Sequence, residues 1–313
     1  MKKFLVTGGA GFIGSHITET LVSRGHFVRV LDDFSSGKEE NLRPFRKKIE
    51  VVKADIRSPQ ACLKAAQGMD YVLHQAALRS VPKSLQRPAE YNEVNIQGTL
   101  NLLNASLQSK VKMFVFASSS SVYGDAKVFP EREGFLPSPI SPYALTKLAG
   151  EYYCRMFSMH FGLPTASLRY FNVFGPRQSL DDEYAVVVPK FIACFLKNER
   201  PPVFGNGRQS RDFTFVSNVV DANLRAAARV GLRGETFNVA GGRDYTVLEL
   251  VKALAKISGR QLKPVFLPKR PGDVFRTLAD LSLARKKIGF QPKVGFPAGL
   301  KITYDYFKEK MHA

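Results

Sequence analysis

A tyrosine and a lysine at helical spacing are the residues of this sequence best suited to chemistry. Tyr143 and Lys147 are four residues apart, so on a helix they share one face. Ser141 and Pro142 directly precede them, as an N-cap and a helix-starting proline would. A phenol titrates near pH ~10, and an adjacent ammonium favours its ionised form. The pair could therefore take a proton from a hydroxyl group, although the same spacing is also common in helix cores.

A run of serines lies upstream of this pair. Ser118 to Ser121 follow the apolar segment 113–116. If that segment is a parallel strand, these hydroxyls lie at its carboxyl end, where ligands of such sheets bind. On its own the run would be interpreted as a serine-rich loop. With Tyr143 and Lys147 downstream, it favours a single site that combines hydroxyl, phenol and ammonium groups.

A glycine-rich turn near the N-terminus predicts a dinucleotide site. Gly8, Gly11 and Gly14 lie between the apolar strand 4–6 and a helical pattern over 12–24. Gly8 would permit a tight turn, Gly11 would let the backbone approach a diphosphate, and Gly14 would let helix and strand pack closely. The start of the helix offers free N–H groups for the phosphates.

Two acidic residues follow the next predicted strand, 27–32. Asp32 is eighteen residues beyond Gly14, close to where a carboxylate should meet the adenosine ribose hydroxyls. It would repel a 2′-phosphate, so NAD is favoured over NADP. The alternative is that Asp32 and Asp33 only form a turn before Ser35-Ser36-Gly37.

The elements that must position these groups alternate along the chain, which predicts a Rossmann-type α/β fold with a doubly wound parallel sheet. Strands are expected near 3–7, 27–32, 49–54, 70–74, 111–118, 164–170 and 235–239. Helices are expected near 12–24, 58–66, 92–108, 143–160 and 216–230. After Arg169 frequent prolines indicate a looser, smaller, mixed α/β lobe. Because 235–239 reads as another core strand, the two lobes should interleave: 1–174 and 214–241 in one, 175–213 and 242–313 in the other.

Composition narrows the class of protein. The 313 residues are 44% hydrophobic and 23% charged, as in soluble globular proteins, and no apolar run reaches membrane-spanning length or forms a signal peptide. We therefore expect a cytoplasmic protein with no membrane partner. The net charge of +19 would suit nucleic acid, but no nucleic-acid motif accompanies it, so we expect none as partner. Cys62, Cys154 and Cys194 and the five histidines are scattered, which predicts reduced thiols and no metal.

The sequence resembles the extended short-chain dehydrogenase/reductases, and within them the NAD-dependent nucleotide-sugar 4-epimerases, over nearly its whole length. Beyond the motifs above, the resemblance rests on six ordered matches. They are Ala54-Asp55-Ile56, His74-Gln75-Ala76-Ala77, Asn95 in 94–99, Leu168 to Pro176, Ser210 to Phe213, and Arg270 to Asp273.

The resemblance implies that NAD is the cofactor and that the first of the two lobes binds it. Asp55 and Ile56 would flank the adenine. The cofactor-binding residues it implies are Gly8, Gly11, Phe12, Ile13, Gly14, Asp32, Asp33, Ser36, Gly37, Asp55, Ile56, Gln75, Ala76, Ala77, Asn95, Tyr143, Lys147 and Tyr170.

The resemblance also implies a UDP-sugar substrate held largely by the second lobe, with Ser119, Tyr143 and Lys147 as catalytic residues. Ser119 would bridge the sugar O4 and Tyr143, while Arg211 and Arg270 would meet the diphosphate. The substrate-binding residues it implies are Ser80, Val81, Ser119, Ser120, Ser121, Tyr143, Asn172, Val187, Val188, Val203, Phe204, Arg211, Arg270, Asp273 and Thr277.

Several features bear on which member of the family this is. Related dehydratases carry Asp-Glu after the catalytic hydroxyl, and decarboxylases usually carry Glu at the second of these positions, whereas this chain has Ser120 and Ser121. Thr277 stands where glucose-restricted epimerases tend to carry Tyr. Together with 79–82 and 182–191, it favours UDP-GlcNAc/UDP-GalNAc, with UDP-Glc/UDP-Gal also accepted.

Two other functions and one partner stay open. A UDP-glucuronate 4-epimerase would need a cation aimed at the uronate, and no such residue stands out; a non-catalytic NAD-binding sensor is the other alternative. Family members pair two helices in a homodimer. The corresponding segments here, 92–108 and 143–160, are expected to do the same through apolar positions that could be core instead. These are Leu100, Leu103, Leu148, Tyr152 and Phe157.

Overall fold

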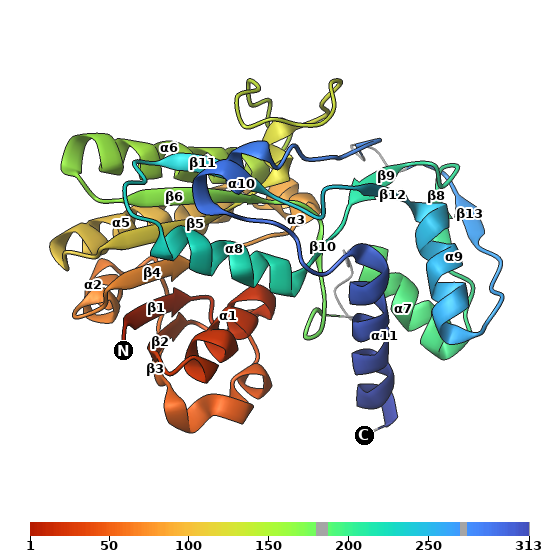
Figure 1. Ribbon diagram of the computed structural model, residues 1–313, viewed down its shortest axis with the longest axis horizontal. Coiled ribbons are helices and arrows are strands. Elements are labelled where there is room, and N and C mark those ends of the chain that lie inside the picture. The colour runs from red at the N-terminus through yellow and green to blue at the C-terminus, as the bar shows by residue number, and fades with distance from the viewer. Residues whose placement is uncertain (180–186, 270–273, 313) are drawn as a thin grey trace.

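The computed structural model describes residues 1–179, 187–269 and 274–312. Its centre is a parallel sheet of seven strands in the order β11-β6-β5-β4-β1-β2-β3 (Figure 1). The strands are β1 (Lys3–Thr7), β2 (Phe27–Asp32), β3 (Glu50–Lys53), β4 (Tyr71–His74), β5 (Met113–Ser119), β6 (Thr165–Tyr170) and β11 (Glu235–Val239). All seven strands predicted from the sequence are confirmed to within a few residues, and so is the doubly wound fold.

Helices cover both faces of this sheet, and together they form the sheet lobe. One face carries α1 (Phe12–Ser23), α8 (Val216–Ala228) and α10 (Ser282–Ile288), and the other carries α2 (Pro59–Ala66), α5 (Gly98–Gln108) and α6 (Pro142–Phe161). Central strands such as β5 bury side chains on both faces, as expected of a parallel sheet. The predicted helices 12–24, 58–66, 143–160 and 216–230 are confirmed.

The predicted helix 92–108 was wrong in its first third. Residues Asn92–Gln97 form a π-helical turn (η3) after the short helix α4 (Pro88–Tyr91), and regular α-helix begins only at Gly98. The hydroxyl of Thr99 donates a hydrogen bond to the carbonyl of Asn95 at 2.6 Å. A side chain that takes a backbone carbonyl in this way locally disturbs the helical ladder. Shorter helical segments are η1 (Glu39–Asn41), η2 (Arg43–Lys48), α3 (Val81–Gln86) and η4 (Ser120–Tyr123).

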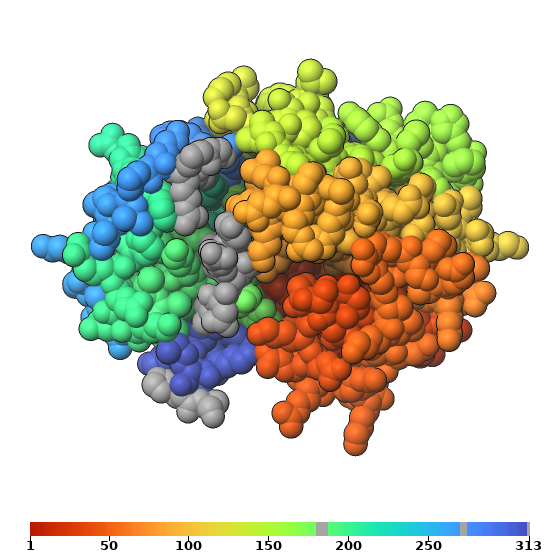
Figure 2. Space-filling model, turned by 180° about the vertical axis from the view of Figure 1, so that it is seen from behind, coloured from red at the N-terminus to blue at the C-terminus, as the bar shows by residue number. Residues whose placement is uncertain are grey.

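A second cluster of elements, the small lobe, lies beside the sheet lobe (Figures 1 and 2). It contains α7 (Val187–Lys197), α9 (Val247–Ser258) and α11 (Phe296–His312), which pack around one apolar cluster. Three short strand pairs accompany them: β7 (Val173–Phe174) with β10 (Thr214–Phe215), β9 (Ser210–Asp212) with β12 (Asp244–Thr246), and β8 (Pro202–Phe204) with β13 (Val265–Leu267). The proline-rich part of the chain is thus more regular than the sequence suggested.

The two lobes exchange chain segments. After β6 the chain enters the small lobe and then returns through α8 to β11, which pairs in parallel with β6. Residues Ala279, Leu281, Ala284, Ile288 and Phe290 also pack in the sheet-lobe core. The chain therefore crosses between the lobes several times, and the crossing segments lie beside the carboxyl ends of the strands.

Some classes of feature are absent from the described residues. No helix among them is long and apolar enough to cross a membrane. Within the same ranges, no group of three His, Cys, Asp or Glu side chains could hold a metal ion. The three cysteines are buried free thiols.

Candidate active site

A cavity of about 500 Å³ lies at the carboxyl ends of the sheet strands. It brings together seventeen of the eighteen residues that the sequence proposed for the cofactor. These are Gly8, Gly11, Phe12, Ile13, Gly14, Asp32, Asp33, Ser36, Gly37, Asp55, Ile56, Gln75, Ala76, Ala77, Tyr143, Lys147 and Tyr170.

Asn95 is the exception, because it supports the cavity wall from behind. Its side chain is 2% exposed. Its amide oxygen accepts from the Leu78 N–H at 2.8 Å, and its amide nitrogen donates to the Leu78 carbonyl at 2.9 Å and to Thr146 Oγ1 at 3.0 Å. Asn95 therefore fixes the backbone of a lining residue while remaining outside the lining itself.

The turn after β1 needs its glycines. Gly8 has φ 64°, and a Cβ on it would lie 2.8 Å from the Ala76 backbone nitrogen. A Cβ on Gly14 would lie 2.1 Å from the Gly8 carbonyl oxygen. Side chains at these positions would force the backbone apart, so the turn can stay this tight only as glycine. The close approach leaves room for a ligand against the first turn of α1.

The two aspartates at the end of β2 do different work. Asp32 is 6% exposed, and its carboxylate accepts from the backbone N–H groups of Ala10 and Phe34, both at 2.8 Å. Burial raises the pKa of Asp32. Asp33 instead accepts from the backbone and hydroxyl of Ser35 at 2.9 and 2.7 Å. The turn-forming interpretation thus describes Asp33, whereas Asp32 joins the glycine turn to the end of β2.

The helix α6 places Tyr143 and Lys147 in the cavity. Ser141 caps it, its hydroxyl accepting from the Ala144 N–H at 3.2 Å, and Pro142 opens it, as the sequence indicated. The Lys147 ammonium donates to the Ala117 carbonyl at 2.8 Å and lies 5.9 Å from the centre of the Tyr143 ring. Burial lowers the pKa of Lys147 to about 7.

The environment of the Tyr143 phenol differs from the expectation that an adjacent ammonium would dominate. Burial raises the pKa of Tyr143, while a hydrogen bond with the Ser119 side chain and the charge of Arg79 lower it. Ser119 lies at the end of β5, and its hydroxyl oxygen accepts from the N–H and the hydroxyl of Ser121 at 3.2 and 2.9 Å. The structure thus joins the serine run to the phenol, as the spacing predicted.

A closed ring of three side chains holds the floor of the cavity. The Tyr170 hydroxyl donates to Gln75 Oε1 at 3.1 Å, and Asn223 Nδ2 donates to the Tyr170 oxygen at 2.8 Å. Gln75 Nε2 completes the ring by donating to Asn223 Oδ1 at 3.1 Å. Asn223 belongs to α8, and no motif in the sequence singled it out. The ring fixes the orientation of two residues that line the cavity.

The residues proposed for the substrate are more dispersed. Asn172, at φ 36°, donates from Nδ2 to Thr277 Oγ1 at 3.0 Å, and Arg211 donates from Nη1 to the Ser210 and Phe275 carbonyls at 2.8 and 3.3 Å. Ser80 caps α3 and Val81 begins it. Val187 and Val188 begin α7, and Val203 and Phe204 belong to β8.

Part of the proposed substrate site cannot be placed. Arg270 and Asp273, and 182–186 of the segment that favoured N-acetylated sugars, lie outside the described residues. Ser120 and Ser121 form η4 immediately after Ser119.

Several residues line the cavity that sequence reasoning missed. From the turn after β7 come Arg177, Gln178 and Ser179, and from α11 come Tyr306, Phe307, Lys310 and Met311. Lys310 also pairs with Glu40 at 2.9 Å, across the two lobes. These residues lie far from the glycine turn in sequence and belong to no motif that the sequence analysis used, so only the fold brings them to the site.

Comparisons with known proteins agree with this geometry. The family model of the NAD dependent epimerase/dehydratase family matches residues 4–240. The chain belongs to this family. A UDP-N-acetylglucosamine 4-epimerase from Methanobrevibacter ruminantium, solved with UDP-N-acetylmuramic acid, is 39% identical with a TM-score of 0.95, covering 99% of both chains. A Thermotoga maritima UDP-glucose 4-epimerase solved with UDP-glucose is 40% identical with a TM-score of 0.94, again covering 99% of both.

The relatives also include an enzyme for an acidic sugar. A UDP-glucuronate 4-epimerase from Thermodesulfobacterium geofontis is 32% identical over 322 residues, covering 99% of this chain and 98% of that one. Membership of the family therefore leaves the sugar unspecified.

The cavity suits NAD, the cofactor of the family. The glycine turn offers the close backbone and helix start that a diphosphate requires. Two buried polar atoms on the wall, Arg177 Nη1 and Gln178 Oε1, have no hydrogen-bond partner among the described residues. Buried polar groups are usually paired, so these atoms are suited to a polar ligand.

Proposed function

We propose that this protein is an NAD-dependent isomerase that inverts C4 of a UDP-hexose. The observation that carries the proposal is the convergence of Tyr143, Lys147 and the glycine turn on one cavity, with Ser119 bonded to the phenol. Such a cavity holds a proton acceptor and a dinucleotide cradle at the carboxyl edge of one sheet, which is what reversible oxidation of a hydroxyl requires.

In this proposal Tyr143 takes the proton of the C4 hydroxyl, and Ser119 bridges that hydroxyl and the phenol. NAD, when bound, supplies the hydride acceptor and returns the hydride to the opposite face of the 4-keto sugar. Lys147 holds positive charge beside the phenol, with its amino group fixed by the Ala117 carbonyl at 2.8 Å. Asp32 meets the adenosine ribose, and Arg211 and Arg270 meet the UDP diphosphate. Because the cofactor is regenerated in each cycle, we expect it to remain bound during purification.

For the sugar, we propose UDP-GlcNAc/UDP-GalNAc, with UDP-Glc/UDP-Gal as a second pair. Two features support this choice. Thr277 is small where glucose-restricted relatives tend to carry Tyr. Ser120 and Ser121 leave no carboxylate after Ser119 for the acid-base steps of dehydration or decarboxylation.

One assay tests both levels of the proposal. C4 inversion would be measured with UDP-GlcNAc, UDP-Glc, UDP-glucuronate and UDP-GalNAc as separate substrates. We expect the N-acetylated sugars to react, with slower turnover of UDP-Glc. Reaction of UDP-Glc without UDP-GlcNAc would overturn the sugar assignment, and reaction of UDP-glucuronate alone would favour the uronate epimerase. Failure of all four, with NAD bound, would favour a non-catalytic sensor.

We further propose that a second copy of the chain packs on α6, as in related homodimers. Leu145, Tyr152, Met156 and Met159 are 43–62% exposed and recur at helical spacing on this helix, which is the pattern of a helix-pairing face. Leu103, Leu148 and Phe157, by contrast, are buried in the sheet lobe and serve the core. Light scattering of the wild type and of Met156→Glu tests the proposal: a dimer that becomes a monomer is expected.

A further inference from the structure

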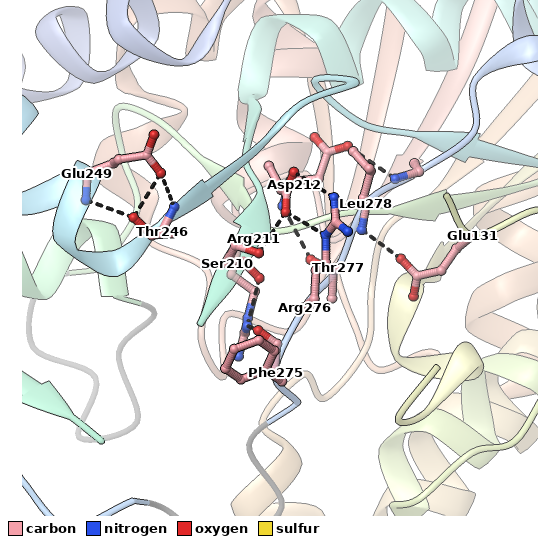
Figure 3. A network of polar contacts seen from close by, with 12 residues as sticks. Glu131, Ser210, Arg211, Asp212, Thr246, Glu249, Phe275, Arg276, Thr277 and Leu278 are labelled. Carbon is pink, nitrogen blue, oxygen red and sulfur yellow. Dashed lines mark hydrogen bonds and ion pairs between the residues drawn. The ribbon is translucent and has the colours of Figure 1, made fainter. Parts of the chain in front are cut away.

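A short strap, residues 275–280, runs from the small lobe to the sheet lobe and carries Thr277 (Figure 3). It lies alongside β9: the Ser210 N–H donates to the Phe275 carbonyl at 3.0 Å, and the Thr277 N–H donates to the Ser210 carbonyl at 3.2 Å. At its other end, the Asp280 N–H donates to the Glu131 carbonyl at 2.8 Å. The strap therefore belongs to both lobes, and its position depends on what holds it between them.

Two buried carboxylates hold the middle of the strap through its backbone. Asp212 Oδ2 accepts from the Ala279 N–H at 3.2 Å, and Glu131 Oε2 accepts from the Leu278 N–H at 2.9 Å. Their side chains belong to residues that are 0% and 1% exposed. Burying a carboxylate is costly unless it is hydrogen-bonded, so two of them at consecutive strap residues require a reason.

Asp212 connects the strap to the sheet. Its Oδ1 accepts from the N–H groups of Gly241 and Gly242, just beyond β11, at 2.8 and 3.1 Å. Asp212 thus bonds on one side to the end of a sheet strand and on the other to Ala279. The single side chain sets the distance between the carboxyl edge of the sheet and the strap.

The main chain of Asp212 meets the residues proposed for the sugar nucleotide. Its N–H donates to Thr277 Oγ1 at 3.3 Å, and its carbonyl accepts from Asn172 Nδ2 at 3.2 Å. Asn172 Nδ2 also donates to Thr277 Oγ1 at 3.0 Å. A shift of Asp212 would therefore displace Asn172 and Thr277 together. The glycine turn and Tyr143 have no such connection in the bonds just described.

We propose that Asp212 and Glu131 are positioning residues that fix the strap and thereby set the affinity for the UDP-sugar, without taking part in proton transfer or in cofactor binding. The nature of the substrate here rests on the function proposed above. The chemistry of the ligand is that of a uridine diphosphate compound bound between the strap and β9.

Asp212→Asn tests this directly. With its amide oxygen on Gly241 and Gly242, the new side chain turns an NH₂ group toward the Ala279 N–H, so two donors face each other and the strap is released there. A lost hydrogen bond to a charged group corresponds to about tenfold or more in affinity. We expect the Kd of UDP, measured by calorimetry on the NAD-loaded protein, to rise by about that factor. The KM of the reactive UDP-sugar should rise with it, while kcat stays within about twofold.

Glu131 supplies a rescue experiment, and Glu249 supplies a matched control. Glu131→Ala removes the acceptor for Leu278 and should weaken UDP binding, whereas Glu131→Gln keeps an amide oxygen there and should restore most of the affinity. Glu249 lies in the small lobe and also accepts a backbone N–H, that of Thr246 at 2.7 Å (Figure 3). It caps α9 and makes no printed bond to the strap, so Glu249→Gln should leave UDP binding unchanged.

The outcomes separate positioning from general stability. Faster hydrogen exchange confined to 275–280 with unchanged NAD content supports the proposal. Loss of NAD in parallel with loss of UDP affinity would overturn it, as would a fall in kcat with an unchanged KM. Should Asp212→Asn fail to fold, the Glu131 pair decides alone, and equal UDP affinity in Glu131→Ala and wild type would overturn the proposal. A wild type that binds UDP but turns over no UDP-sugar refutes the proposed reaction only, whereas one that binds no UDP refutes both.

Discussion

The two sides of the active-site region are built in different ways. The proposed cofactor side depends on one local unit, strand, glycine turn and helix, in which Gly8 and Gly14 exclude side chains by direct contact. The proposed substrate side is assembled from remote segments, and Asp212 and Glu131 hold it together by accepting backbone N–H groups. The first construction is rigid because no alternative backbone fits. The second is adjustable, because it relies on a few hydrogen bonds between lobes.

The largest effect is expected where the two sides meet. Tyr143→Phe removes the phenol oxygen and should lower turnover of UDP-sugars by about 10²–10⁴-fold, the usual contribution of a positioned acid-base group. NAD content should stay at the wild-type value, because the ring and Lys147 remain. Turnover and bound NAD would be measured on the same preparation.

Tyr152→Phe is the control for that change. Tyr152 lies on the same helix and is 51% exposed, so its hydroxyl should have no influence on turnover. An equal loss of activity in both variants would contradict the assignment of Tyr143.

The next effect concerns the stability of the sheet behind Ser119. Glu151 and Arg169 form an ion pair at 2.7 Å with both side chains 4% exposed. Glu151→Ala would leave a buried guanidinium unpaired, which typically costs about 3–5 kcal/mol in the free energy of unfolding. Urea unfolding would measure it. The exposed pair Lys301–Asp305 provides the contrast: Asp305→Ala should cost under ~1 kcal/mol, and similar losses for the two variants would show that burial does not matter here.

A smaller effect distinguishes the rigid construction on the cofactor side. Gly14→Ala places a Cβ 2.1 Å from the Gly8 carbonyl oxygen, and such overpacking typically costs about 1–3 kcal/mol. The displaced turn should also lose most of its bound NAD, measured by absorbance after denaturation. Gly295→Ala, where a Cβ would meet nothing within 4 Å, should retain both stability and NAD. Full NAD content in Gly14→Ala would mean that the turn can relax after all.

The smallest effect is a pH dependence confined to the substrate side. Burial raises the pKa of Glu131 from its usual 4.5 to about 7, so between these values the folded protein holds a proton that the unfolded chain has released. The free energy of unfolding contributed by this group therefore falls as pH rises from 4.5 to about 7. Glu131→Gln cannot titrate, and relative to wild type it should gain on the order of 1–3 kcal/mol across that window.

Glu249 gives the opposite sign and serves as the check. Its pKa is lowered by the hydrogen bond from the Thr246 N–H, so its contribution to stability is lost as pH falls through the lowered value. Unfolding curves of wild type, Glu131→Gln and Glu249→Gln over a pH series would show the two trends. Parallel curves for all three proteins would contradict both.

The local unit is also the part that the sequence predicted well. All seven sheet strands and the glycine turn could be placed, because apolar runs, glycine spacing and the Asp32 position depend on neighbours in the chain. The prolines misled the expectation for the small lobe. Pro189 and Pro297 lie in the first turns of α7 and α11, where the missing N–H is not needed, so they start helices there instead of breaking them.

The remote construction left no comparable signal. Tyr306 and Phe307 reach the cavity only because α11 packs between the lobes, and Arg177 and Gln178 only because the turn after β7 folds over α1. The buried contacts of Asp212 with Ala279 and of Glu131 with Leu278 join residues 67 and 147 positions apart. Pairings of this kind depend on the tertiary fold, and neither periodicity nor motif spacing encodes them.

The place of β11 in the sheet has a practical consequence for dissecting the molecule. This strand covers the outer side of β6, yet it lies about sixty residues further along the chain, after the excursion through the small lobe. A truncated fragment stopping at residue 174 would expose the backbone N–H and C=O groups of β6, and such bare edges promote aggregation. Expression of the cofactor half by itself therefore calls for a permuted chain that carries β11 along.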